Sequence, residues 1–316
     1  MSGINKFYIL YVFTIDSLRL FLRKSKMALW LLPIPKTCQD GDYGNAYIRQ
    51  MLEENICVFV GRVGFIESVY AGAVLSMRTI GIGRKLLEKT AYKIFEHDQF
   101  WPPQFAQVSK YGEETLAAIS QIDVYIGWKT FLERIFRKYV CSKSSVCVDF
   151  YSLEPFCYEK PWSSGLKGKR VLVICPFPKT IERQYQKRKL LWPSHPEILP
   201  DFELLTMKSI YGKNSAPQCL TWFDALDCMY NEAMKHVFDV AILACGPFAI
   251  PLGQRFKSAG RSAITMCGVT QILFGIKGKR WDDRPYISKF YNEHWVRPDE
   301  NELPEFTKRI EGGCYR

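Results

Sequence analysis

The chain has 316 residues, of which 47% are hydrophobic, 15% aromatic and 24% charged. This composition excludes a disordered protein, a collagen and a coiled coil, and the length is sufficient for one large α/β domain or two smaller ones. With 43 Lys and Arg against 32 Asp and Glu, the net charge is +11, so nucleic acid and anionic membranes have to be considered as partners.

The arm formed by residues 1–36 is basic. Its segment 4–30 carries Phe7, Leu10 and Tyr11 among apolar residues at helical spacing, which predicts an amphipathic helix. The apolar run is interrupted too early for a transmembrane helix and lacks the cleavage site of a signal peptide. Six basic residues against one acidic give the arm a charge of +5. It either contacts an anionic membrane surface or is an ordinary packing helix with basic residues at its C-terminal end.

The remaining residues, 37–316, are predicted to form one α/β domain. Residues 56–60 are a short apolar run, typical of a buried strand, and a turn with two glycines follows it. Further strands are predicted over 123–126, 170–175, 239–244 and 262–266, and helices over 66–77, 84–95, 113–120, 131–139, 180–190 and 249–258. Thr180 is the expected N-cap of its helix. This alternation predicts a Rossmann-like, mostly parallel sheet flanked by helices.

Cysteine and histidine patterns indicate neither a disulfide framework nor a metal site. The chain has 11 Cys, an odd number, and no C-x-x-C pair. Cys57, Cys175 and Cys245 lie in apolar runs, where a free thiol packs as a small hydrophobe. The four His are far apart and lack zinc-ligand spacing. We therefore expect free thiols, a reducing compartment and no structural zinc.

Ligands of parallel sheets bind beyond the carboxyl ends of the strands, which here are the turns after Val60, Cys175 and Cys245. Glycines in these turns let the backbone approach a ligand, and the helix starts beside them favour negative charge. The residues expected to hold a phosphate-bearing ligand are Gly61, Arg62, Gly64, Lys179, Arg183, Gly246, Pro247, Lys279 and Arg280. A solvated helix face is the alternative explanation for the basic residues near the second turn.

Several common nucleotide and hydrolase motifs are absent. There is no G-x-x-x-x-G-K-[ST], the Gly81-Ile82-Gly83 segment has Leu86 where a third glycine would stand, and there is no G-x-S-x-G. A P-loop kinase, a dehydrogenase and an α/β-hydrolase are therefore disfavoured. No recognisable RNA or DNA module accompanies the basic charge, so we expect no nucleic-acid partner.

Four segments together resemble proteins of bacterial polysaccharide gene clusters that are similar to glycosyltransferases of the GT-D fold. They are GRVGFIES (61–68), VLVICPFPKTIERQY (171–185), CGPFAIPLGQRFKSAGRSAI (245–264) and the tail from TQILFGIKGKRWDD to YNEHWVRP (270–298). The resemblance implies a sheet that binds a nucleotide-diphosphate sugar and passes the sugar to a hydroxyl of a glycan or lipid-linked acceptor. It also implies a cytoplasmic protein, working at the inner face of the cell membrane if the basic arm binds there.

The acidic D-x-E motif of GT-D enzymes, which holds a divalent metal, is incomplete here. Phe65 stands in place of the first acid and only Glu67 remains. Glu67 is the candidate metal ligand for Mn²⁺ or Mg²⁺, or the acceptor-side base, unless it is simply a favourable first-turn acid. Asp282 or Asp283 would have to complete a metal site. Basic side chains are the alternative means of stabilising the leaving diphosphate, and a non-catalytic binding module is the alternative function.

Two further acidic residues have local explanations. Asp224 follows Thr221 at the spacing of a capping box. Glu293 and Arg297 have the i, i+4 spacing of an intrahelical ion pair, with a sugar contact as the second interpretation.

Overall fold

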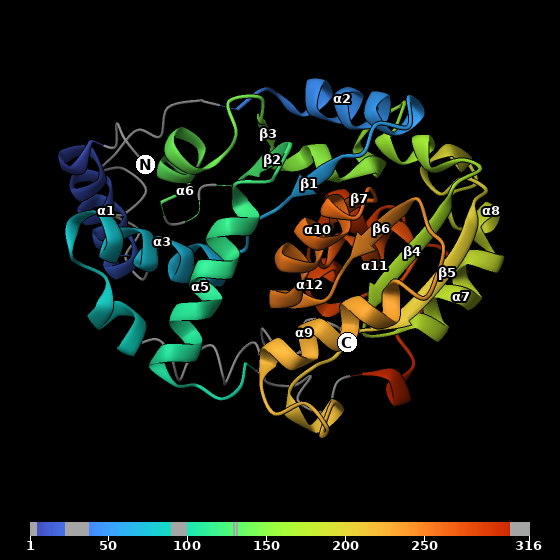
Figure 1. The fold of residues 1–316 in the computed structure, drawn as a ribbon. Helices are drawn as coiled ribbons and strands as arrows, with labels where there is room; N and C mark the ends of the chain where they lie inside the picture. Colours follow the sequence, from blue (N-terminus) through green and yellow to red (C-terminus); the bar gives the residue numbers. More distant parts are fainter. Residues whose placement is uncertain (1–4, 23–37, 90–99, 129, 131, 304–316) are drawn as a thin grey trace.

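The computed structural model describes residues 5–22, 38–89, 100–128, 130 and 132–303, with the backbone alone for 18–22 (Figure 1). The strands in chain order are β1 (Phe59–Gly61), β2 (Val124–Gly127), β3 (Val146–Asp149), β4 (Arg170–Cys175), β5 (Glu203–Lys208), β6 (Val240–Leu243) and β7 (Ser262–Thr265). They form one sheet in the order β3-β2-β1-β7-β6-β4-β5. Every strand pair is parallel. The predicted Rossmann-like α/β class with flanking helices is confirmed.

Helices cover both faces of the sheet (Figure 1). The first face carries α1 (Lys6–Leu22), α3 (Phe65–Ile80), α5 (Phe105–Ile119), α9 (Trp222–Ala233) and α10 (Ala249–Ser258). The second face carries α2 (Gly41–Glu53), α7 (Pro178–Gln186), α8 (Arg188–Leu191) and α11 (Val269–Leu273). Short helices fill the connections: α6 (Glu133–Ile135), η2 (Phe136–Val140), η3 (Phe150–Leu153), η4 (Pro155–Cys157), η5 (Trp162–Leu166), η6 (Pro196–Ile198), η7 (Lys213–Ser215), η8 (Gly246–Phe248), α12 (Lys279–Asp282), α13 (Pro285–Ser288) and η9 (Glu300–Glu302).

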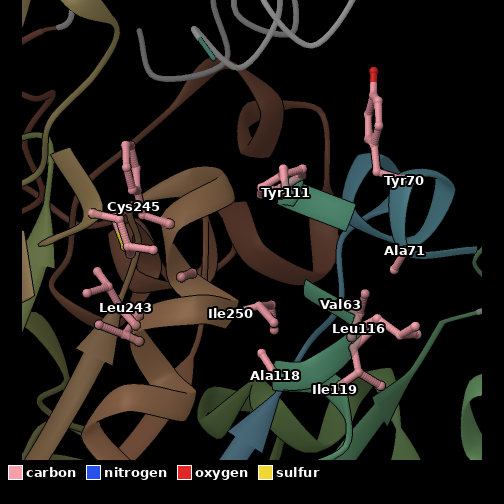
Figure 2. Packing of buried hydrophobic residues seen from close by; sticks show 14 of the residues in the cluster. Val63, Tyr70, Ala71, Tyr111, Leu116, Ala118, Ile119, Leu243, Cys245 and Ile250 are labelled. Carbon is pink, nitrogen blue, oxygen red and sulfur yellow. The ribbon is translucent and has the colours of Figure 1, made fainter. Parts of the chain in front are cut away.

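The sheet is buried on both faces, which explains why its strands are continuous apolar runs. In β4, Leu172 and Ile174 belong to the cluster on the first face, and Val171 and Val173 to the cluster on the second. Figure 2 shows part of the first cluster, with Leu243 at the end of β6 on one side of the view and residues of α3 and α5 on the other. Burial of both faces fixes the register, because a shift by one residue would exchange the faces.

Several element boundaries differ from the predicted ones. β1 begins at Phe59 because Ile56 and Cys57 are exposed, so the expectation that Cys57 is buried is wrong. The helix expected to start at Thr180 begins at Pro178, with Phe177 as its N-cap. Proline suits the first position of a helix because its missing N–H would have no partner there. Thr180 is therefore a buried residue of the first turn and not the cap.

The middle of the chain is more broken than its sequence predicts. The helix expected over 113–120 begins at Phe105 as α5, while the one expected over 131–139 divides into α6 and a π-helical turn, η2. Residues 84–89 are helical as predicted, and the rest of the 84–95 segment lies outside the described residues.

The expected N-terminal helix is present as α1. Ile9 and Val12 are buried against the body, while the side chains of Phe7, Leu10 and Tyr11 are exposed. α1 is apolar on both sides, so periodicity alone does not reveal which side packs. The remainder of the 1–36 arm lies outside the described residues. Among the helices the structure describes, none is long and apolar enough to cross a membrane.

The thiols behave in two ways. Cys175 and Cys245 are buried and free, as expected. Cys38 and Cys147 are joined as a disulfide, with their Cα atoms 4.8 Å apart, so the expectation of free thiols is wrong for this pair. The two residues are 109 positions apart in sequence, and only the pairing of the segment before α2 with β3 brings them together. The Gln39 amide, for example, donates to the Cys147 carbonyl.

We expect Gly253→Ala to destabilise the fold. A Cβ at this position of α10 would lie 2.3 Å from the Phe59 ring of β1. Overpacking costs about 1 to 3 kcal/mol, which outweighs the gain of up to about 1 kcal/mol from higher helix propensity. Urea unfolding measures the difference. Gln254→Ala, one residue further along α10, is the control and should have little effect; higher stability of Gly253→Ala would contradict the close approach.

Candidate ligand site at the carboxyl edge of the sheet

The parallel sheet brings the three predicted turns to one edge. β1 lies beside β7, β7 beside β6, and β6 beside β4, all in the same direction. The chain leaves β1 for α3 on the first face, and leaves β7 for α11 on the second. Connections that diverge between neighbouring strands create a switch point, which is the usual ligand position in open α/β sheets. The boundary of β1 and β7 is therefore the expected ligand position.

Arg62 lies directly at the end of β1. Its amide donates to Thr265 Oγ1 of β7 at 2.6 Å, and its guanidinium carbon lies 4.7 Å from the ring centroids of both Trp128 and Phe150. Trp128 is fixed in turn by its indole N–H, which donates to the Val63 carbonyl at 2.6 Å. The Arg62 Nε atom is buried without a hydrogen-bond partner. Two aromatic faces hold this cation by cation–π attraction.

A second arginine packs on the turn after β7. A Cβ at Gly268 would lie 2.7 Å from Arg280 Nη1 and 3.2 Å from the Trp281 ring. Arg284 lies on the same ring, with its guanidinium carbon 5.1 Å from the Trp281 centroid. Cys267, just before Gly268, adopts a φ of 51°, a backbone conformation that costs energy for a residue with a side chain and that occurs often at functional sites.

Glu154 links these two groups of cations. It is completely buried, with the Cys157 thiol 3.7 Å from Oε2 and the Tyr286 hydroxyl 3.5 Å from Oε1. Burial raises the pKa of Glu154 to about 7, although the positive charges of Arg62 and Arg284 act to lower it. A carboxyl group with such a pKa can take up or release a proton near neutral pH. We name Arg62, Arg280, Arg284 and Glu154 the switch-point cluster.

Sequence reasoning identified two members of this cluster and missed two. Arg62 and Arg280 were predicted because they stand beside glycine turns. Glu154 and Arg284 stand in no motif, and the sequence carries no sign that the segment after β3 meets the segment after α12. The edge contact between the rings of Tyr151 and Tyr286, with centroids 6.5 Å apart, belongs to this meeting.

Glu67 lies on the first turn of α3, and its carboxylate folds back over Gly64, the N-cap of that helix. A Cβ at Gly64 would lie against this carboxylate, which would have to move aside. This geometry agrees with the favourable placement of an acid at a helix N-terminus. It leaves both the catalytic and the metal-binding role of Glu67 as predictions.

The described residues do not fit a divalent metal. They contain no group of three or more His, Cys, Asp or Glu that could hold one. Asp282, considered as a completing ligand, instead accepts from Arg297 at 2.8 Å. Mn²⁺ and Mg²⁺ prefer several oxygen ligands, which the described residues do not bring together.

The turn after β4 is already filled by a carboxylate of the chain. Glu302 of η9 is buried and accepts from the amides of Lys179 and Thr180 at 2.7 and 2.8 Å, and from the Thr180 hydroxyl at 2.6 Å. Arg183 pairs with Asp299 at 3.4 Å. The N-terminus of α7, which the sequence assigns to a phosphate, therefore binds an internal anion.

The other predicted residues occupy different surroundings. Gly246 begins η8 after β6 with a φ of 58°, and the space where its Cβ would stand is open. Pro247 beside it is buried, and Lys279 is exposed at the start of α12. Gly61 is the buried last residue of β1. At this edge, the turn after β6 has free space at Gly246, and the turn after β4 holds the Glu302 carboxylate. The turns after β1 and β7 carry arginine side chains.

The two local predictions have opposite outcomes. Thr221 and Asp224 form the expected capping box of α9, so Asp224 is explained by local structure. The intrahelical pair of Glu293 and Arg297 is wrong, because this segment is not helical. Arg297 bonds to Asp282, and Glu293 lies 3.5 Å from His294.

This chain matches no protein-family model, no curated protein and no solved structure in the three comparisons made.

The buried carboxyl of Glu154 should make stability depend on pH. Its pKa is raised from 4.5 to about 7 on folding, so the folded protein holds a proton that the unfolded chain has lost. Stability should then fall as the pH rises from about 4.5 through about 7, by roughly 2 to 3 kcal/mol from this group. In urea unfolding at pH 5 and pH 8, Glu154→Gln should lose less stability than the wild type. The control is Glu300→Gln, which should lose as much stability between the two pH values as the wild type does. An equal loss in Glu154→Gln and in the wild type would contradict a raised pKa of Glu154.

Removal of the internal anion should destabilise α7. Glu302→Ala leaves two amides and a hydroxyl without their acceptor, at a cost of about 1 to 3 kcal/mol. Glu300→Ala in the same short helix removes an exposed carboxylate and should change stability by less than about 0.5 kcal/mol. Thermal unfolding of both variants checks the difference.

Proposed function

We propose that the chain binds the diphosphate of a nucleotide sugar at the switch-point cluster and transfers the sugar to an acceptor hydroxyl of a glycan or lipid-linked glycoconjugate. The observation that carries the proposal is the presence of three arginines at the carboxyl ends of β1 and β7: Arg62 beside β7, Arg280 on the turn after β7, and Arg284 on the neighbouring Trp281 ring. The reaction class comes from the resemblance of the sequence to GT-D glycosyltransferases. Such an enzyme would work in the cytoplasm.

The arginines suit a diphosphate better than a single carboxylate partner. Arg62 is held by aromatic rings, so its planar fork of N–H donors is oriented before a ligand arrives. Arg280 lies against the glycine turn after β7, where the backbone is closest to the ligand position. When a sugar leaves a diphosphate, negative charge grows on the phosphate oxygens, and fixed cations stabilise that charge without reorganisation.

Two carboxylates are candidates for the base that activates the acceptor. Glu154 has a pKa near neutrality and contacts Tyr286, a partly exposed residue. Glu67 lies on α3 at the same edge of the sheet. We propose Glu154 as the group that takes the acceptor proton and Glu67 as a helix-capping residue. The rate of sugar transfer distinguishes these roles. Glu154→Gln should lower this rate at least about a hundredfold, while Glu67→Ala should keep most of the wild-type rate.

A non-catalytic nucleotide-sugar-binding module is the second candidate. The observation that favours it is the replacement of the first metal-binding acid by Phe65, together with the lack of a metal-binding group among the described residues. This module predicts binding of a nucleotide sugar without release of the sugar.

Calorimetric titration with UDP-, GDP- and CMP-sugars, with and without manganese, tests the proposal. At least one of them should bind, and Arg62→Ala, Arg280→Ala and Arg284→Ala should each weaken the affinity by about tenfold or more, because each removes a charge-assisted hydrogen bond.

The matched control is Arg261→Ala. Arg261 also lies over an aromatic ring, with its guanidinium carbon 5.9 Å from the Phe238 centroid, but it precedes β7 at the opposite edge of the sheet. Its removal should leave the affinity unchanged. If no nucleotide sugar binds, or if Arg261→Ala weakens binding as much as the three cluster variants, the proposed site is wrong.

A further inference from the structure

The outer face of α1 carries three large apolar side chains, Phe7, Leu10 and Tyr11. Their exposed fractions are 82%, 45% and 56%. The spacing i, i+3, i+4 places them side by side on one stripe of the helix. Large apolar side chains that gather on one exposed face mark a site of interaction. Figure 1 shows α1 at the margin of the molecule, beside α3 and α6.

Two acidic groups of the described residues, Asp16 and Glu133, are turned into the protein beside this helix. Asp16, on α1, is buried and accepts from the Leu132 amide at 2.9 Å. Glu133, on α6, is buried and accepts from the amides of Trp128 and Thr130 at 3.0 and 3.1 Å. Neither carboxylate therefore contributes negative charge to the outer face.

Basic groups flank the same face. Lys6, the first residue of α1, and Lys138 of η2 are exposed. Lys138 reaches α1, with its Nζ atom 4.5 Å from the Tyr8 ring centroid. Arg19, Arg23, Lys24 and Lys26 follow later in the sequence. An apolar stripe bordered by cations, beside which the carboxylates of Asp16 and Glu133 are buried, is complementary to an anionic lipid surface.

We propose that the outer face of α1 docks on an anionic lipid bilayer. Phe7, Leu10 and Tyr11 enter the boundary between headgroups and acyl chains, and Lys6 and Lys138 contact lipid phosphates. A second copy of the chain is disfavoured as the occupant because each copy carries +11 and like charges repel. The inference does not depend on the proposed enzymatic function.

Sedimentation with lipid vesicles tests this inference. The full chain should bind vesicles of phosphatidylcholine with about 30% phosphatidylserine, and bind pure phosphatidylcholine at least about tenfold more weakly, since the attraction includes the headgroup charge. Phe7→Ser/Leu10→Ser/Tyr11→Ser should reduce the partition coefficient on anionic vesicles by about tenfold or more. Phe7→Ser alone is a milder variant that should give a smaller loss of the same sign.

The control is Leu220→Ser/Val237→Ser. These two apolar residues are 77% and 58% exposed and flank α9, so their removal changes surface hydrophobicity without touching α1. This variant should bind anionic vesicles as the wild type does. Circular dichroism and UDP-sugar titration of the triple variant show whether the fold and the switch-point cluster are intact, which separates this inference from the proposed function.

Three results would overturn the inference. The wild type could fail to bind anionic vesicles, or the triple variant and Phe7→Ser could bind them as the wild type does. The third is a wild-type dimer in sedimentation velocity that the triple variant abolishes, because the outer face of α1 would then be an interface between two copies of the chain.

Discussion

Burial of one parallel sheet on both faces is the constraint from which the rest of the structure follows. Because neither face meets water, the strands are continuous apolar runs, and their alternate residues enter two separate clusters of helices. Because all strands run in one direction, every turn that follows a strand lies at the same edge. The polar chemistry of the chain is thereby concentrated where the strands end.

The positive groups at that edge have two different roles. At β4, the amides that open α7 and the side chain of Arg183 are satisfied by Glu302 and Asp299, so the positive end of the helix stabilises the fold. At β1 and β7, Arg62 is held by aromatic rings and Arg280 lies against a glycine turn. A cation held by rings keeps its capacity for an anionic ligand, and this contrast is why the ligand site is placed at β1 and β7.

Elements are predicted well where the sequence pattern fits only one structure, and poorly where it fits two. Residues 170–175 and 249–258 match β4 and α10 because apolar runs there are bounded by clear turn signals. α1 is apolar on both sides, so its packed side could not be chosen without its neighbours. Glu154 could not be found because its role comes from burial and from segments far apart in the chain. Likewise, the sequence gives no sign that Glu302, 122 positions after Thr180, lies at the N-terminus of α7, where we predicted a phosphate.

The position of β1 beside β7 has a consequence for biosynthesis. The Val58 amide bonds to Ser262, 204 residues later in the chain, and α7 receives its carboxylate from Glu302. A growing chain on the ribosome can pair β1 with β2, but the centre of the sheet stays incomplete until nearly all of the protein has been made. Contacts of such long range slow folding and leave hydrophobic edges exposed in the meantime. We therefore expect the nascent chain to be most prone to aggregation before its last strand emerges.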